Sequence, residues 1–279
     1  MIHNKRGLKG VWLFFSSIIA LTIVLGIFFN QFLFMLLFQY GYSEVYAGNN
    51  KTGNKIMNYA ISKMKKPDAE IYHALSVQNT KNGNYDIAIE ALKKSYEINP
   101  RDAGAYYGWV LLYYYHDYEQ ALQVLNEFDD STPDFSDWPM GECIHYLKGL
   151  AHKEMGQYEL ALNEFITSIE NTSTENDANW VDYQVFLNKG ISLFYLERYA
   201  DAITAFNQAI SNNDKCSEAY YFIGLSQLKL GNNESGCINL DKAHSLVSKG
   251  YKSSDPYVEL FHEIYIQQVD QHILQNCMN

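Results

Sequence analysis

The chain has 279 residues, of which 47% are hydrophobic and 15% aromatic, and its formal net charge at pH 7 is −11. Such an acidic balance argues against a nucleic-acid partner, because phosphate binding needs a basic surface. The four cysteines lie far apart without a C-x-x-C pair, so the sequence indicates neither a zinc site nor a dense disulfide framework. Unpaired cysteines also weigh slightly against an oxidising compartment.

The N-terminal segment differs in composition from the rest of the chain. Residues 1–10 form a basic tail, and residues 11–33 contain no charged side chain. About 20 apolar residues are enough to cross a bilayer as one helix. The alternative is a cleaved secretory signal, but the apolar run is too long for one and no small-residue cleavage site lies close behind it. We therefore predict a transmembrane helix at residues 11–33, with the lipid bilayer as its partner.

The charges that flank this span predict its orientation. Lys5, Arg6 and Lys9 precede it without an acidic residue, which favours a cytoplasmic N-terminus. The remainder of the chain is then extracytoplasmic, and periplasmic if the protein is bacterial. Lysines at positions 51, 55, 63, 65 and 66 also lie beyond the span and weaken this prediction.

Residues 34–68 leave two interpretations open. The stretch "GNNKTGNKIMNYA", residues 48–60, parallels "GNNESGCINLDKA", residues 231–243, in its glycines, asparagines and alanine. If the parallel reflects structure, residues 34–68 contain a degenerate first helical hairpin that continues directly from the membrane helix. Otherwise Asn and Gly coincide in a linker.

From residue 69 the chain repeats one amphipathic pattern. The stretch "GNYDIAIEALKKSYEINP", residues 83–100, has a turn glycine, a helix with one apolar side and a closing proline. Its aromatic residue at position 85 recurs after steps of 33, 40 and 41 residues. Small residues come next at Ala88, Ala121, Ala161, Ala202 and Gly236, and larger apolar residues that would fill the space between helices at Leu92, Leu125, Phe165, Phe206 and Leu240.

This pattern resembles the tetratricopeptide repeat (TPR) family, whose unit is about 34 residues of helix, turn and helix. Residues 69–102 match it best, with Tyr72, Leu75, Gly83, Ala88 and Pro100 at the family's positions. The resemblance implies an all-α, TPR-type solenoid of helical hairpins. It covers about five repeats in residues 69–254, two of them with extended loops at "DDSTPDFSDWPMG" and "NTSTENDANWVD".

Residues 255–279 are expected to form one capping helix. Asp255 is a suitable N-cap and Pro256 a suitable first helical residue. Val258, Phe261 and Ile264 begin an apolar face that would cover the last open surface of the array.

No catalytic constellation is found. "HEIY" at His262 begins like a zinc-protease helix but lacks the second histidine, and "GNNESG" lacks the lysine of a phosphate loop. The sequence therefore predicts no enzyme, no cofactor and no metal.

Recognition of another protein remains as the function. In the TPR family the first helix of each hairpin lines a concave groove, and the matching positions here are mostly aromatic or aliphatic. This favours a protein or peptide partner with a helical or apolar segment, and not a clamp for a terminal carboxylate. The alternative is that the protein's own loops or terminal helix fill the groove, or that these residues pack between repeats. The predicted groove residues are Tyr107, Leu111, Tyr114, Tyr115, Tyr146, Leu150, Leu187, Ile191, Phe194, Tyr195, Tyr221 and Leu225.

The sequence thus predicts a membrane-anchored scaffold or adaptor that mediates protein–protein interaction. The competing function is an accessory subunit of a membrane enzyme, transporter or secretion complex, contacted mainly through the transmembrane helix.

Overall fold

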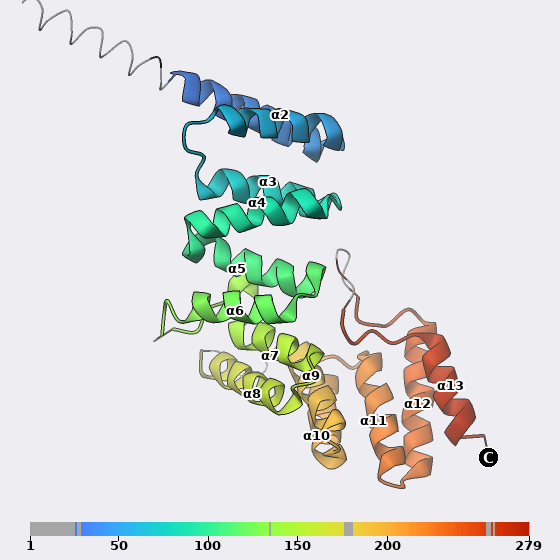
Figure 1. Cartoon of the computed structure of the whole chain (residues 1–279). Coiled ribbons are helices and arrows are strands. Elements are labelled where there is room, and N and C mark those ends of the chain that lie inside the picture. Colours follow the sequence, from blue (N-terminus) through green and yellow to red (C-terminus); the bar gives the residue numbers. More distant parts are fainter. Residues whose placement is uncertain are drawn as a thin grey trace, which may run out of the picture. The chain divides into compact units, whose positions relative to one another are not determined.

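The computed structural model describes residue 26 and residues 29–133, 135–175, 181–254, 258 and 260–278. These residues form helices and no strands, which confirms the predicted all-α class for the described chain (Figure 1). None of their helices is long and apolar enough to cross a membrane. The basic tail and most of the span predicted at residues 11–33 lie outside the described residues. The chain divides into two compact units, Met1–Ala103 and Gly104–Asn279.

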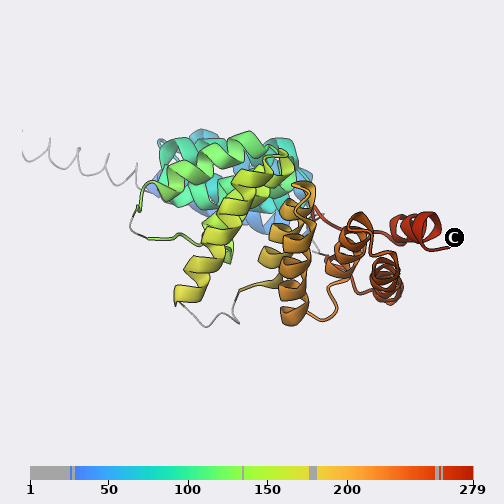
Figure 2. The same ribbon diagram turned by 90° about the horizontal axis from the view of Figure 1, so that it is seen from below.

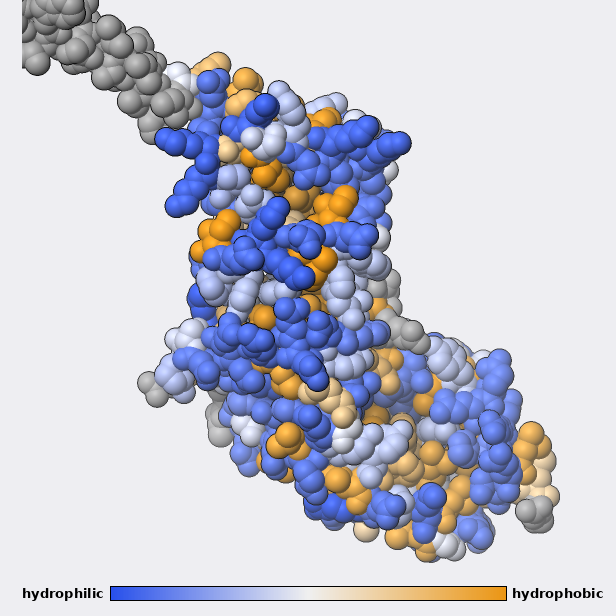
Figure 3. Space-filling model, viewed as in Figure 1, coloured by the Kyte–Doolittle hydropathy of each residue, from blue (hydrophilic) through white to orange (hydrophobic). Residues whose placement is uncertain are grey.

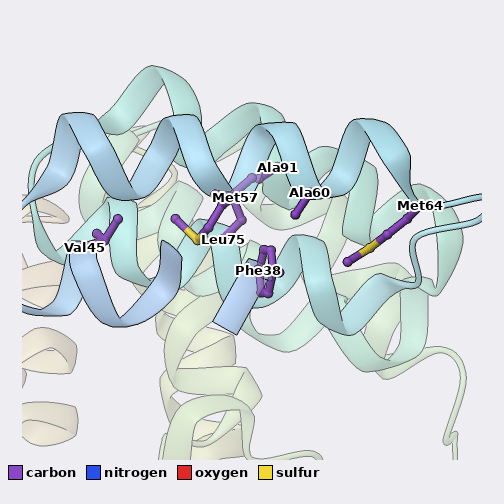
Figure 4. Packing of buried hydrophobic residues seen from close by; sticks show 7 residues of the cluster. All are labelled: Phe38, Val45, Met57, Ala60, Met64, Leu75 and Ala91. Carbon is purple, nitrogen blue, oxygen red and sulfur yellow. The ribbon is translucent and has the colours of Figure 1, made fainter. Parts of the chain in front are cut away.

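The first unit contains two helical hairpins. A helix over residues 29–46 pairs with α2 (Asn50–Lys63), and α3 (Ala69–Lys81) pairs with α4 (Tyr85–Ile98). Phe38, Met57 and Leu75 belong to one buried cluster that joins the first helix, α2 and α3 (Figure 4). Residues 34–68, for which a linker was the other interpretation, therefore contain a packed hairpin.

A buried pair of amides joins α2 to α3. Asn54 Nδ2 donates to Asn79 Oδ1 at 2.8 Å, and Asn79 Nδ2 donates back to Asn54 Oδ1 at 2.9 Å. A buried amide that loses its partner costs about 1–3 kcal/mol. The pair therefore favours one register between the two hairpins of this unit.

The second unit continues the hairpin pattern and ends in an additional helix. Figures 1 and 2 show α11, α12 and α13 side by side at its C-terminal end. The hairpins are α5 (Pro100–Val110, continued by the π-helical turn η1, Leu111–Tyr115) with α6 (Tyr118–Asp129), α7 (Ile144–Glu154) with α8 (Tyr158–Glu175), α9 (Tyr183–Tyr195) with α10 (Tyr199–Asn212), and α11 (Ser217–Lys229) with α12 (Asn233–Ser248), followed by α13 (Ile266–Asn276).

A small residue on the first helix faces a large one on the second in each of these hairpins. A Cβ atom added to Gly149 would lie 2.5 Å from the ring of Phe165, and one added to Gly190 would lie 2.5 Å from the ring of Phe206. Both rings are fully buried. Leu125 and Leu240 meet Gly108 and Gly224 in the same way. The residues predicted to fill the space between helices therefore do so, and the glycines permit the close approach.

The first and last hairpins share a tighter crossing. A Cβ atom on Gly53 would lie 2.5 Å from the backbone oxygen of Gly41, and one on Gly236 would lie 3.1 Å from that of Gly224. Gly53 and Gly236 occupy the same place in the two parallel sequence stretches. The parallel therefore corresponds to a shared helix crossing.

The turns within the hairpins depend on one left-handed residue each. Glycine takes this conformation at Gly83, Gly156 and Gly231, with φ between 72° and 81°. His116 (φ 52°) and Glu197 (φ 60°) take it without glycine's freedom. Turn geometry is therefore kept where the glycine of the repeat pattern is lost.

The two predicted loop extensions pack back onto the second unit. Glu142, directly after the first extension, accepts hydrogen bonds from Trp109 Nε1 at 2.8 Å and Tyr113 Oη at 3.1 Å. Asn171 Nδ2 donates to Ser136 Oγ at 3.0 Å, which links the two extensions. The second was predicted as a loop from residue 171, but α8 continues to Glu175.

The C-terminal capping helix was predicted from residue 255, whereas α13 begins at Ile266. Residues 260–265 are not helical, and burial alternates among them: His262 and Ile264 are buried, while Tyr265 is exposed. The Glu263 backbone N–H donates to the Leu260 carbonyl at 3.3 Å, so this part of the segment contains a turn. Phe261 and Ile264, which were expected on one helix face, instead belong to a non-helical segment that packs against other helices.

Substitution of Gly190 by Ala tests the close approach within a hairpin. Alanine improves helix propensity by about 1 kcal/mol, but its methyl would overlap the buried Phe206 ring, and overpacking costs about 1–3 kcal/mol. We expect a net loss in the free energy of unfolding, measured by chemical denaturation of the full chain in detergent.

A second substitution provides the control for this test. Phe206→Leu removes ring atoms that the new methyl would meet, so G190A/F206L is expected to lose less stability than the sum of the two single variants. Strictly additive losses would contradict the proposed overlap.

Candidate functional site

The segment between α12 and α13 crosses other helices of the second unit. We call its described residues, 249–254, 258 and 260–265, the C-terminal linker. The Phe261 ring stacks on Tyr113 of η1 with centroids 5.5 Å apart, and it meets the rings of His116 and Tyr118 at 5.5 and 5.9 Å. Lys153 Nζ lies 5.8 Å from the Phe261 centroid. The linker thus inserts an aromatic side chain between η1, α6 and α7.

Polar contacts hold the other end of the linker. The Ser253 backbone N–H donates to Glu218 Oε1 at 2.7 Å, and the hydroxyls of Ser253 and Tyr183 lie 3.2 Å apart. Glu218 is fully buried, and burial raises the pKa of its carboxyl. The linker is therefore hydrogen-bonded to α9 and α11 as well as packed on α6 and α7.

Two basic side chains are buried where the linker packs on α7, namely His262 of the linker and Lys153 of α7. Burial, together with the nearby charge of Lys153, lowers the pKa of His262 to about 3. Burial also lowers the pKa of Lys153, against the attraction of Glu154, whose Oε1 lies 2.7 Å from Lys153 Nζ. His262 is accordingly neutral at pH 7.

Most of the predicted groove residues are not accessible. Tyr146 Oη, for example, donates to Gln184 Oε1 at 3.1 Å, so it joins α7 to α9. Tyr114 and Tyr115 of η1 are half-buried. The fully buried members are Tyr107, Leu111, Tyr146, Leu150, Leu187, Ile191 and Tyr221.

An open groove remains at the C-terminal end, bounded by α9, α11 and α13. We call it the C-terminal groove. Its volume is about 630 Å³, within the ~300–1,000 Å³ typical of ligand pockets. Tyr195 is 53% exposed there, and its ring stacks on Tyr158 at 4.9 Å. The groove brings together four predicted residues, Phe194, Tyr195, Tyr221 and Leu225, with Phe222, Leu228, Lys229, Gln268, His272, Gln275 and Asn276.

The groove combines an aromatic floor with an amide-rich rim. Phe194 and Phe222 meet at 5.4 Å, and Tyr221 meets His272 of α13 at 5.7 Å. Burial raises the pKa of Tyr221 to about 12 and lowers that of His272, so both side chains are neutral at pH 7. Lys229 is exposed at the rim, and the described lining residues include no carboxylate. The groove suits an apolar or aromatic segment flanked by amide or acidic side chains.

A disulfide holds one wall of the groove. Cys237 of α12 is bonded to Cys277, which caps the C-terminus of α13, across 40 residues of sequence. The expectation that the cysteines are unpaired is therefore wrong for these two, because α13 lies against α12. Cys143 and Cys216 are buried free thiols.

Sequence reasoning missed the residues that α13 contributes. Gln268 and His272 lie in the predicted terminal helix, but no repeat position assigns them to a groove. Within the described ranges, no group of three or more His, Cys, Asp or Glu side chains is placed to hold a metal ion.

Comparison with known families identifies repeats in three places. Models described as tetratricopeptide repeat match residues 187–235, and also residues 69–102 and 144–173. They include the best-matching repeat predicted from the sequence and most of α9 and α11. The predicted TPR repeats are confirmed at these residues.

Solved structures with the same fold include several of MamA. MamA from Desulfovibrio magneticus RS-1 (residues 41 to the end) aligns with a TM-score of 0.55 and 18% identity over 65% of this chain and 96% of that chain. MamA MSR-1 aligns with a TM-score of 0.53 and 20% identity over 65% and 98%. At such identities the likeness shows the fold alone, and it confirms the TPR-type helical solenoid. No curated protein matches the sequence significantly.

Lowering the pH should weaken the linker through His262. A histidine in an unfolded chain has a pKa of about 6.5, whereas that of His262 is about 3. Between these values only the unfolded state binds the proton, so the free energy of unfolding falls by about 1.4 kcal/mol per pH unit below pH 6.5.

The measurement compares the wild type with His262→Gln by chemical denaturation at pH 7.5 and 5.5. Other groups that titrate, including Glu218, are common to both proteins and cancel in the difference. We expect the wild type to lose about 1.4 kcal/mol more than the variant, and equal losses would contradict a buried neutral His262.

Removal of the disulfide should loosen α13. A cross-link that closes 40 residues is worth roughly 3–4 kcal/mol in the chain-entropy model. We expect the α13 amides of Cys237→Ser/Cys277→Ser to exchange with solvent deuterium faster than those of the wild type. Reducing agent should reproduce this effect in the wild type and add nothing in the variant; unchanged exchange would show that packing alone holds α13.

Proposed function

We propose that the protein is a membrane-anchored TPR scaffold that holds a partner protein through the C-terminal groove. The partner contributes an apolar or aromatic segment, which is helical or extended. The observation that carries this proposal is the aromatic surface of the C-terminal groove, where Tyr195 is exposed and Phe194 half-buried. The predicted aromatic residues outside this groove are buried (Tyr107 and Tyr146) or half-buried (Tyr114 and Tyr115). TPR proteins commonly bind protein segments along the surface formed by the first helices of their hairpins.

The position of Lys229 adds a preference in charge. Its side chain is exposed at the groove rim, where a carboxylate beside the apolar anchor would find a partner. Aromatic anchors in a pocket supply most of the binding energy in such complexes. The aromatic floor therefore provides affinity, and the rim selects the flanking residues.

The proposed location rests on the sequence and is supported by the disulfide. Residues 11–33 are uncharged and long enough to span a bilayer, and the basic residues before them favour a cytoplasmic N-terminus. The Cys237–Cys277 bond is of the kind that persists in oxidising compartments. We therefore place the repeats outside the cytoplasm.

Site-specific photo-crosslinking in native membranes tests the scaffold function. The full chain carries a photoreactive amino acid in place of Tyr195, or of Tyr85 as a control that is similarly exposed on α4 (53% and 45%). We expect a discrete adduct from position 195 and none from position 85.

A charge reversal at the rim completes the test. Lys229→Glu places an acidic group at the groove, and we expect the adduct yield at position 195 to fall by about tenfold, the effect of 1.4 kcal/mol. Circular dichroism should show unchanged helix content. Equal adducts at positions 195 and 85, or an adduct insensitive to Lys229→Glu, would contradict binding in this groove.

A further inference from the structure

The first helix of the chain has an apolar stripe that faces solvent. Phe29, Phe32, Leu33, Leu36 and Tyr40 recur at intervals of three or four residues, which places them on one side of the helix. Their exposed fractions lie between 48% and 67%. Figure 3 shows hydrophobic residues at the surface in this part of the first unit.

The opposite side of the same helix already serves the fold. Phe38 and Val45 are fully buried in the cluster with Met57, and Phe34 and Leu37 pack against it (Figure 4). Gly41 lies against the backbone of Gly53. Packing of the hairpin therefore does not require the exposed stripe, and a helix that is apolar on both sides indicates a second apolar environment.

Three exposed lysines lie at the same end of the hairpin as the start of the stripe. Lys63 ends α2, and Lys65 and Lys66 come directly after it. Because the two helices run antiparallel, with Gly53 near the start of α2 against Gly41 in the second half of the first helix, the end of α2 returns toward the beginning of the first helix. An apolar surface is thus flanked by a cluster of positive charge.

We propose that this stripe and Lys63, Lys65 and Lys66 seat the first hairpin on the surface of a bilayer that contains anionic lipid. This inference rests on the proposed membrane anchor, and it ends the spanning segment at about residue 28, so that residues 29–33 of the predicted span lie at the bilayer surface. The stripe enters the boundary between headgroups and acyl chains, and the lysines meet the lipid phosphates. Tyr40 lies at the far end of the stripe, a residue type enriched at such boundaries.

A bilayer fits these features better than a protein partner. Tightly bound protein surfaces are depleted of lysine, whereas apolar residues beside a lysine cluster are typical of helices that bind anionic membranes.

The test uses the full chain reconstituted in vesicles of phosphatidylcholine, with or without phosphatidylglycerol. Leu36→Cys carries an environment-sensitive fluorophore; Cys143 and Cys216 are buried and Cys237 is bonded to Cys277, so labelling is selective. Lys93→Cys, exposed on α4, is the control position. We expect quenchers attached to lipid to reduce the signal at position 36 severalfold more than at position 93, and most strongly with phosphatidylglycerol.

Charge variants separate the lysines from the anchor. K63E/K65E/K66E should lower the lipid quenching at position 36 severalfold, while K81E/K93E/K94E, with the same change in net charge, should leave it unchanged. The chain should remain with the vesicles in both cases.

Two results would overturn the inference while the anchor stands. One is a label at position 36 that is quenched only from water. The other is efficient disulfide cross-linking between two copies of unlabelled Leu36→Cys in excess lipid, which would assign the stripe to a protein interface. A chain that does not associate with vesicles at all would overturn the anchor and this inference together, yet binding in the C-terminal groove could still be tested by photo-crosslinking.

Discussion

The close approach of two helices within each hairpin is the constraint on which this structure depends. A glycine on the first helix or an alanine on the second permits this close approach. One large apolar residue fills the space that remains, as Gly190 and Phe206 show. Once each pair is closed, its outer apolar side chains can be buried only by the neighbouring hairpin. The aromatic residues on the first helices, such as Tyr146, are therefore largely consumed by packing. Accessible aromatic surface survives where α13 and the C-terminal linker take the place of another hairpin.

The sequence predicted those parts of the fold that depend on local periodicity. The residues that fill each hairpin and the turns result from repeated spacing, and the structure reproduces them. The parallel between residues 48–60 and 231–243 left a hairpin and a linker both open, and the structure has the hairpin. The sequence did not predict that residues between α12 and α13 form the C-terminal linker. Val258, Phe261 and Ile264 fit a helical face as well as a non-helical segment, and the choice depends on Tyr113, which is remote in sequence. Position within a repeat carries no information about a contact of this kind.

The residues of the candidate site were likewise predicted only where they occupy repeat positions. Repeat positions led to Phe194, Tyr195 and Leu225, but those positions could not show which groove residues remain open, because their surroundings include α13. Gln268 and His272 come from α13, which has no counterpart in the repeats. The pairing of Cys237 with Cys277 likewise depends on α13 lying against α12.

The Cys237–Cys277 bond makes a closed covalent ring of α12, the C-terminal linker and α13. A protease that cuts the backbone once within this ring cannot separate α13 from the rest of the chain, since the disulfide still joins the two fragments. In the extracytoplasmic location proposed above, the last wall of the groove would thus survive a nick that would detach an ordinary C-terminal helix.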